Sequence, residues 1–223
     1  MKKFERLDEA AAPDGTVLTL YRHDHDYTIR IDGVELMSTR RHHSEEQLAE
    51  LVCAPLLHQR NARVLIGGLG FGFTLKAALR SLAPDAQVVV AELVEGVINW
   101  NRNPEYPLAH EALNDARVVL RPVNVLTLLK ASSRAFDAIM LDVDNGADPL
   151  TTAGNARLYH AVGIHMAAAA LRAGGSLAYW SAHVDPSFER SLRDAGLSVE
   201  VTRVRAHVTS GYRHTLYVAR RSD

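Results

Sequence analysis

The sequence predicts an α/β protein in which helices cover both faces of a mostly parallel sheet, with a small antiparallel β unit in front of it. From residue 63 onward, continuous apolar runs alternate with amphipathic stretches, a pattern typical of parallel strands that are buried on both faces. A glycine-rich turn joins the first apolar run to a helix pattern. Before residue 44, short strands and turn signals occur instead.

The N-terminal part is expected to contain three strands. They cover residues 16–21, 27–31 and 34–37. The Asp32-Gly33 pair, a strong turn signal, separates the last two. We therefore place a small β unit at residues 1–43 and a larger α/β domain at residues 44–223.

A helix is expected to open the larger domain. Ser44 and Gln47 have the spacing of a capping box, in which the serine is the N-cap. Pro55 is expected to kink or end this helix.

The rest of the chain alternates strand and helix patterns. Strands are expected at residues 64–66, 88–91, 118–120, 138–141 and 176–180, and helices at 75–82, 94–100, 125–129 and 159–171. The last two expected strands, 199–204 and 215–219, would form an antiparallel hairpin at the sheet edge.

The composition of the chain bears on its partners and its location. The 223 residues include 25 Lys and Arg against 26 Asp and Glu, a formal charge of −1, so we expect no nucleic-acid partner and no membrane partner. The single cysteine, Cys53, is expected to fill the core and suits a cytoplasmic protein. The charged start and the short apolar run at 161–171 predict neither a leader nor a membrane span.

The glycine-rich turn is a candidate ligand site. Gly67, Gly68, Gly70 and Gly72 follow a strand and precede a helix, so the backbone can approach a ligand closely and the helix start offers free N–H groups. A tight turn without a ligand is the alternative. The spacing lacks the third glycine of a dinucleotide loop and resembles the nucleoside loop of S-adenosylmethionine-dependent transferases.

Carboxylates follow two of the expected strands. Glu92 comes directly after residues 88–91, where an acid can accept hydrogen bonds from both ribose hydroxyls of a nucleoside. Asp142, Asp144 and Asp148 follow residues 138–141. The carboxyl ends of parallel strands line one crevice, so these acids are expected to share a cavity with the glycine turn, although each could instead shape a turn.

Such a site suits attack by an amine on a carbon bonded to a sulfonium. The leaving group is a neutral thioether that needs no acid, so catalysis consists largely of holding the two reacting atoms in line. Asp142 would orient the amine and accept its proton, and Asp144 would supply a counter-charge for the substrate.

The order and spacing of these segments resemble the spermidine synthase (polyamine aminopropyltransferase) family, in a short bacterial form. The resemblance runs from about Val17 to Ala219. The segments that carry it are Asp32 to Ser38, Ser44 to Glu46, Cys53 to Leu57, Val64 to Gly68, Glu92 to Ile98, Phe136 to Asp142 and Leu158 to Gly175.

The resemblance implies a seven-stranded Rossmann-like methyltransferase fold, with helices on both faces of a mostly parallel sheet, after the small β unit. It also implies that Glu92 holds the donor's ribose and that Asp142 is the catalytic aspartate. A small-molecule amine substrate, a role in polyamine biosynthesis and a homodimer are further implications.

Three positions depart from the family's pattern. The glycine turn has no acid where the family carries one that holds the donor's amine. Asn124 stands where the family has an aspartate that contacts adenine, and Asn145 stands where the acid loop has its second aspartate, with Asp144 one place earlier. Intact S-adenosylmethionine, with its carboxylate near a helix start, is therefore an alternative donor.

Several other residues could have either a functional or a simpler structural role. Trp180 could wall the acceptor pocket or simply pack, and Tyr212 lies near the family's pocket-closing loop. Trp100 is expected in the core. His23 and His25 share a strand face, but no third ligand is indicated, so no metal site is predicted.

We therefore expect a transferase that moves an aminopropyl group from decarboxylated S-adenosylmethionine to a polyamine-type amine. An S-adenosylmethionine-dependent methyltransferase on the same fold is the alternative. A non-catalytic nucleoside-binding or dimerisation module is the third possibility.

Overall fold

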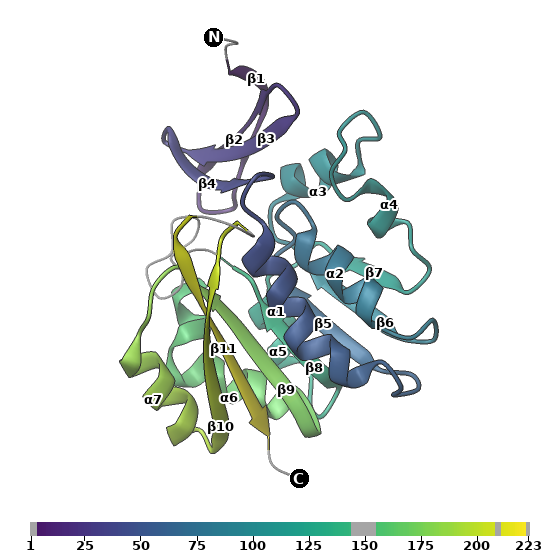
Figure 1. Cartoon of the computed structure of the whole chain (residues 1–223), viewed down its shortest axis with the longest axis vertical. Coiled ribbons are helices and arrows are strands. Elements are labelled where there is room, and N and C mark those ends of the chain that lie inside the picture. Colours follow the sequence, from purple (N-terminus) through teal and green to yellow (C-terminus); the bar gives the residue numbers. More distant parts are fainter. Residues whose placement is uncertain (1–3, 144–154, 208–210, 222–223) are drawn as a thin grey trace.

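The structure is a computed structural model that describes residues 4–143, 155–207 and 211–221. It contains a four-stranded sheet and a seven-stranded sheet. Figure 1 shows the small sheet at one end of the molecule, beyond the larger sheet and its helices. The predicted α/β class, with a small antiparallel unit in front, is confirmed.

The small sheet is an antiparallel meander of four strands. In chain order and in spatial order these are β1 (Glu5–Ala11), β2 (Val17–His23), β3 (Asp26–Ile31) and β4 (Val34–Ser38). The last three confirm the predicted strands, and the Asp32-Gly33 turn has positive φ at both residues, 49° and 80°. The sequence did not indicate β1, because its side chains are mostly exposed and largely charged on this edge strand.

Helix α3 (Glu95–Arg102) joins the small sheet to the larger domain. The indole N–H of Trp100 donates to a carboxylate oxygen of Asp8 at 2.8 Å. A Cβ at Gly96 would lie 2.0 Å from the Cβ of Ala10, so this glycine lets the helix approach β1 closely. Trp100 is only 2% exposed, which confirms its predicted place in the core.

The larger sheet has the predicted seven strands. They are β5 (Arg63–Gly67), β6 (Gln87–Ala91), β7 (Val118–Arg121), β8 (Phe136–Leu141), β9 (Leu171–Ser181), β10 (Leu197–Arg205) and β11 (Arg213–Arg221), in the spatial order β10-β11-β9-β8-β5-β6-β7. Strands β5 to β9 run parallel where they pair, and β11 is antiparallel to both of its neighbours. The predicted C-terminal hairpin at the sheet edge is thus confirmed.

Helices cover both faces of this sheet. Besides α3 they are α1 (His43–Cys53), α2 (Phe73–Ser81), α4 (His110–Leu113), α5 (Val125–Lys130), α6 (Ala161–Ala170) and α7 (Pro186–Asp194), with short 3-10 turns at Ala54–Leu56 and Asn155–Tyr159. Helices α4 and α7 were not predicted from the sequence. Helix α7 has a recognisable start, because Asp185 caps the N–H groups of Ser187 and Phe188 and Pro186 occupies the first turn.

The two faces of the sheet have separate cores because side chains alternate along each strand. Val64 and Ile66 of β5 belong to the core that includes α1, α2 and α3, whereas Leu65 belongs to the core that includes α5, α6 and α7. Cys53 is fully buried in the first core, as predicted. No helix among the described residues is long and apolar enough to span a membrane.

The predicted capping box at the start of α1 is wrong. The helix begins at His43, and His42 occupies the N-cap position without a side-chain cap. Ser44 therefore lies inside the first turn, where its hydroxyl contacts His214 and Trp180. These tertiary partners replace the local capping interaction. A domain boundary near residue 43 stays a prediction.

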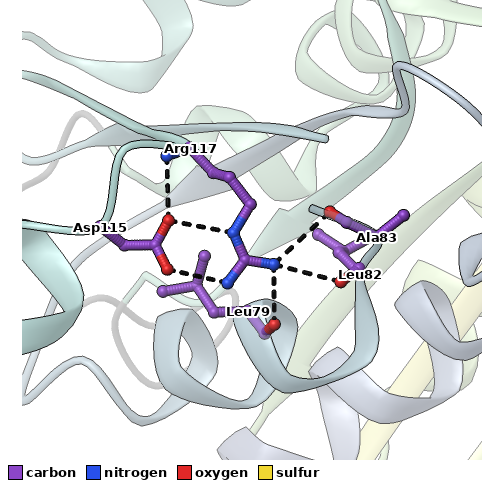
Figure 2. Close-up of polar contacts among 5 residues, drawn as sticks. All are labelled: Leu79, Leu82, Ala83, Asp115 and Arg117. Carbon is purple, nitrogen blue, oxygen red and sulfur yellow. Dashed lines mark hydrogen bonds and ion pairs between the residues drawn. The ribbon is translucent and has the colours of Figure 1, made fainter. Parts of the chain in front are cut away.

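Arg117 stabilises the C-terminal end of α2, as Figure 2 shows. One of its terminal nitrogens donates to the carbonyl oxygens of Leu79 (3.0 Å), Leu82 (3.1 Å) and Ala83 (3.5 Å). The rest of the guanidinium pairs with both carboxylate oxygens of Asp115. These hydrogen bonds from Arg117 lower the pKa of Asp115 to about 2.

Replacing Arg117 with Met is expected to lower the free energy of unfolding by about 1 to 3 kcal/mol, since carbonyl groups at the end of α2 lose their partner. Urea unfolding at neutral pH measures this, with the exposed Arg121→Met as control. The pKa of Asp115 is lowered in the folded protein, so the ionised carboxylate stabilises the fold. This stabilisation is complete above the ordinary pKa of an aspartate and is lost as pH falls toward about 2. An unchanged unfolding midpoint would contradict this role.

Candidate active site

A cavity of about 280 Å³ lies at the carboxyl ends of β5, β6 and β8. Its floor includes Gly68 and Gly70 of the glycine turn, and Ile29 and Met37 of the small sheet contribute to its wall. The helix start of α1 and the strands β9 and β11 complete the lining. The small N-terminal sheet therefore helps to enclose a site that the larger sheet builds.

The glycine turn needs glycine chiefly for close packing. Gly68 has φ of 91°, and a Cβ there would lie 2.3 Å from the carbonyl oxygen of Asp142. Side chains at Gly67 and Gly72 would collide with Leu141 and Ala109, respectively. Of the four predicted glycines, Gly68 and Gly70 line the cavity. Packing thus accounts for Gly67 and Gly72, and a donor-binding role for the turn stays a prediction.

Glu92 lies directly after β6 and is 8% exposed. Its Oε2 accepts the backbone N–H of Leu69 at 2.9 Å, and its Oε1 accepts the backbone N–H of Val94 at 2.8 Å. The carboxylate therefore joins the glycine turn to the start of α3, and it lines the cavity where the sequence analysis expected a nucleoside.

Asp142 lies directly after β8 and also lines the cavity. Its Oδ2 accepts the hydroxyl of Thr74, in the first turn of α2, at 2.7 Å. Burial raises the pKa of Asp142 to about 6, although the Thr74 hydrogen bond opposes this shift. A carboxylate with this pKa is a better proton acceptor than an ordinary aspartate at neutral pH.

Glu45, in the first turn of α1, is a cavity residue that the sequence analysis did not single out. Burial, and then the charge of Asp142, raise its pKa well above the ordinary value, while Lys76 acts in the opposite direction. An acid in the first turn of a helix is common, so the sequence offers no sign of this role. Only the packing of α1 against α2 and β8 brings Glu45 to Asp142.

The balance of charge in the cavity is negative. The described residues that line it include four carboxyl groups and one guanidinium: Glu35, Glu45, Glu92, Asp142 and Arg41. Arg41 forms an ion pair with Glu35. The wall therefore favours a cationic ligand over an anionic one.

Three of the remaining predicted residues line the cavity, and two lie outside the described residues. Asn124 lines it, but its Oδ1 also accepts the N–H of Leu126 as the N-cap of α5, at 2.9 Å. Trp180 and Tyr212 line it too, and Tyr212 is 79% exposed. Asp144 and Asp148 lie outside the described residues.

No group of three or more His, Cys, Asp or Glu side chains within residues 4–143, 155–207 and 211–221 has an arrangement that could hold a metal ion.

Solved structures resemble this chain along almost its whole length, whereas no family model and no curated protein sequence matches it. A spermidine synthase in complex with the transition-state analogue AdoDATO has a TM-score of 0.74 at 17% identity, over 99% of this chain and 74% of that chain. Spermidine synthase from Thermotoga maritima has a TM-score of 0.73 at 18% identity, over 99% and 75% of the two chains. This protein has the spermidine synthase fold.

A third structure agrees. A probable spermidine synthase from Corynebacterium glutamicum has a TM-score of 0.64 at 16% identity, over 99% of this chain and 81% of that chain. The predicted resemblance to the family is confirmed at the level of the fold, including the seven-stranded methyltransferase-like sheet.

Within this spermidine synthase fold, the sequence analysis missed residues that act through tertiary contacts. Thr74 holds Asp142, and Ser44 connects His214 with Trp180. Thr74 follows the glycine turn closely and could have been noticed as a polar residue at a helix start. The signal for His214 is weaker, because it is one of 11 histidines and lies in a strand.

Proposed function

We propose that this protein is an aminopropyltransferase that uses decarboxylated S-adenosylmethionine and a small amine. The observation that carries the proposal is Asp142, a half-buried carboxyl at the end of β8 that lines a cavity with a negative balance of charge. The fold shared with spermidine synthases supports the same reaction. A cytoplasmic location, a homodimer and a part in polyamine biosynthesis remain predictions.

The reaction needs an uncharged amine and an alkyl carbon that is held in line with it. The amine nitrogen forms a bond to the aminopropyl carbon attached to the sulfonium, and the carbon–sulfur bond breaks with its electron pair going to sulfur. The products are a neutral thioether nucleoside and a secondary ammonium. Asp142 is proposed to accept one proton from that ammonium, which leaves a secondary amine, and to pass the proton to solvent.

Glu92 is proposed to bind the ribose of the donor. The backbone N–H groups of Leu69 and Val94 fix both of its carboxylate oxygens, so the carboxylate is held in one orientation at the cavity wall. Asn124 lines the cavity, and its side-chain amide is proposed to hydrogen-bond to the adenine of the donor. These contacts would hold the nucleoside while the sulfonium carbon faces Asp142, which is the in-line arrangement that the reaction needs.

The charge of the cavity favours the decarboxylated donor over intact S-adenosylmethionine. The two differ by a carboxylate, which would enter a wall that contains the carboxylates of Glu92 and Asp142. Arg41 is the guanidinium of the described wall, and Glu35 already pairs with it. Methyl transfer from intact S-adenosylmethionine is the alternative, because the glycine turn lacks an acid for the donor's amine.

Calorimetric titration with the two donors tests this proposal. We expect the decarboxylated donor to bind at least about tenfold more tightly, a difference of about 1.4 kcal/mol. Tighter binding of intact S-adenosylmethionine would overturn aminopropyl transfer in favour of methyl transfer. Binding of neither donor would favour a module that has lost the reaction.

A further inference from the structure

The first turn of α1 divides the cavity wall into two chemically different sides. Glu45 lies with Asp142 and Thr74 on one side, whereas the preceding residue, Ser44, contacts β9 and β11. Consecutive helix residues point about 100° apart, so the two neighbours serve different parts of the same cavity. The first side carries carboxyl groups, and the second carries hydrogen-bonding and aromatic groups.

Three residues from three elements form the second side. The indole N–H of Trp180, on β9, donates to the hydroxyl oxygen of Ser44 at 3.1 Å. That hydroxyl lies 2.8 Å from Nδ1 of His214, on β11. The rings of Trp180 and His214 also contact edge to face, with centroids 4.5 Å apart.

The buried hydroxyl of Ser44 favours one tautomer of His214. The indole nitrogen can only donate, so Ser44 must accept from Trp180. The serine is 1% exposed, and within the described residues the acceptor for its own proton is Nδ1 of His214. The neutral imidazole therefore carries its proton on Nε2, which forms no hydrogen bond to any described residue.

The surroundings of His214 also keep its ring neutral. Burial, followed by the charges of Arg41 and His183, lowers its pKa to about 4. The residue lines the cavity. It therefore contributes an uncharged imidazole with one N–H donor to this part of the wall.

We propose that Nε2 of His214 binds an oxygen at the far end of the acceptor amine, so that the preferred acceptor is a hydroxyl- or carboxylate-bearing monoamine and not a diamine. This inference rests on the proposed aminopropyl transfer and makes His214 its specificity-determining residue. A distal ammonium group can only donate hydrogen bonds. It therefore cannot pair with the N–H group at Nε2, which also donates. The reacting amine would lie at the other end, beside Asp142.

The shape of this side agrees with such an acceptor. The indole of Trp180 provides a flat wall next to the imidazole, against which a short methylene chain can pack. A site built to hydrogen-bond one polar group discriminates strongly against analogues that lack that group. The chain length would be limited by the cavity volume of about 280 Å³, which the donor must share.

The test compares four-carbon amines that differ only at the far end: aminobutanol, aminobutyrate, butylamine and putrescine. With saturating decarboxylated donor, we expect kcat/KM for aminobutanol or aminobutyrate to exceed the values for butylamine and putrescine at least about tenfold. The comparison between aminobutanol and aminobutyrate separates a hydroxyl from a carboxylate. A higher value for putrescine would overturn the inference.

Two substitutions at His214 make the assignment specific. His214→Phe keeps a planar ring against Trp180 but removes the donor, so the preference for the oxygen-bearing amine should fall to within about threefold. His214→Gln places an amide N–H near the Nε2 position and should retain part of the preference. His58→Gln, at an exposed residue outside the cavity, is the matched control. An unchanged preference in His214→Phe would also overturn the inference.

Acceptor binding distinguishes failure of this inference from failure of the proposed function. Calorimetry of the same amines, with the protein saturated by the thioether nucleoside methylthioadenosine, needs no turnover. Absence of turnover with every amine, together with selective binding that His214→Phe abolishes, would refute the proposed reaction and support the subsite. Binding that does not distinguish the amines, or no binding, would refute the subsite.

Discussion

Replacing Asp142 by Asn is expected to reduce kcat by about 10² to 10⁴, the usual effect of losing a positioned proton acceptor. The Asn side chain has nearly the same shape and keeps an oxygen that can accept the hydroxyl of Thr74. It cannot accept a proton from the attacking amine. Release of the thioether nucleoside from the decarboxylated donor measures the loss.

The pKa of Asp142 adds a second expectation for the same variant. A pKa raised to about 6 means that the folded protein binds this proton more tightly than the unfolded chain does. The ionised carboxylate therefore destabilises the fold above pH 6, and Asp142→Asn should raise the free energy of unfolding there by up to about 3 kcal/mol. That gain should disappear below pH 4, where the carboxyl is protonated in both states.

Asp194→Asn is the matched control, since Asp194 is exposed in the last turn of α7. It should change neither turnover nor the pH dependence of stability. Full activity of a folded Asp142→Asn protein would remove Asp142 from the mechanism and with it the observation on which the proposed function depends.

Substituting Gln for Glu92 should raise the Kd of the decarboxylated donor about 10- to 100-fold. The amide group replaces one acceptor with a donor, so either Leu69 N–H or Val94 N–H loses its partner and the ribose loses a charged acceptor. Hydrogen bonds to charged groups contribute about 1.5 to 3 kcal/mol each. Calorimetric titration of the donor checks this value.

The exposed Glu95, three residues further along at the start of α3, provides the control substitution Glu95→Gln. Its donor affinity should equal that of the unsubstituted protein. If Glu92→Gln retains the original donor affinity while unfolding at the same urea concentration, Glu92 does not bind the ribose.

The alternation of apolar strands with helices was sufficient to predict the larger sheet and its C-terminal hairpin. A strand that is covered on both sides needs a continuous apolar segment, such as Val64 to Ile66. The residue pattern therefore predicts which strands are buried. Strand β1 was missed for the opposite reason. It buries little side-chain area on an edge, and its charged residues carry no periodic signal.

The candidate site was predictable where function follows from position in the sheet. Glu92 and Asp142 follow strands whose carboxyl ends share one crevice, and the structure places both in the same cavity. Glu45 and His214 come from a helix start and an edge-proximal strand. Their approach depends on how α1 packs against α2 and β11, which no local pattern in the sequence encodes.

A single incubation tests the central claim most directly. The protein is mixed with an amine panel and equal concentrations of decarboxylated and intact S-adenosylmethionine, and the nucleoside products are separated. Aminopropyl transfer predicts methylthioadenosine, formed in proportion to the alkylated amine and at least about 100-fold more slowly with Asp142→Asn. Formation of S-adenosylhomocysteine with a methylated product would contradict the proposed function.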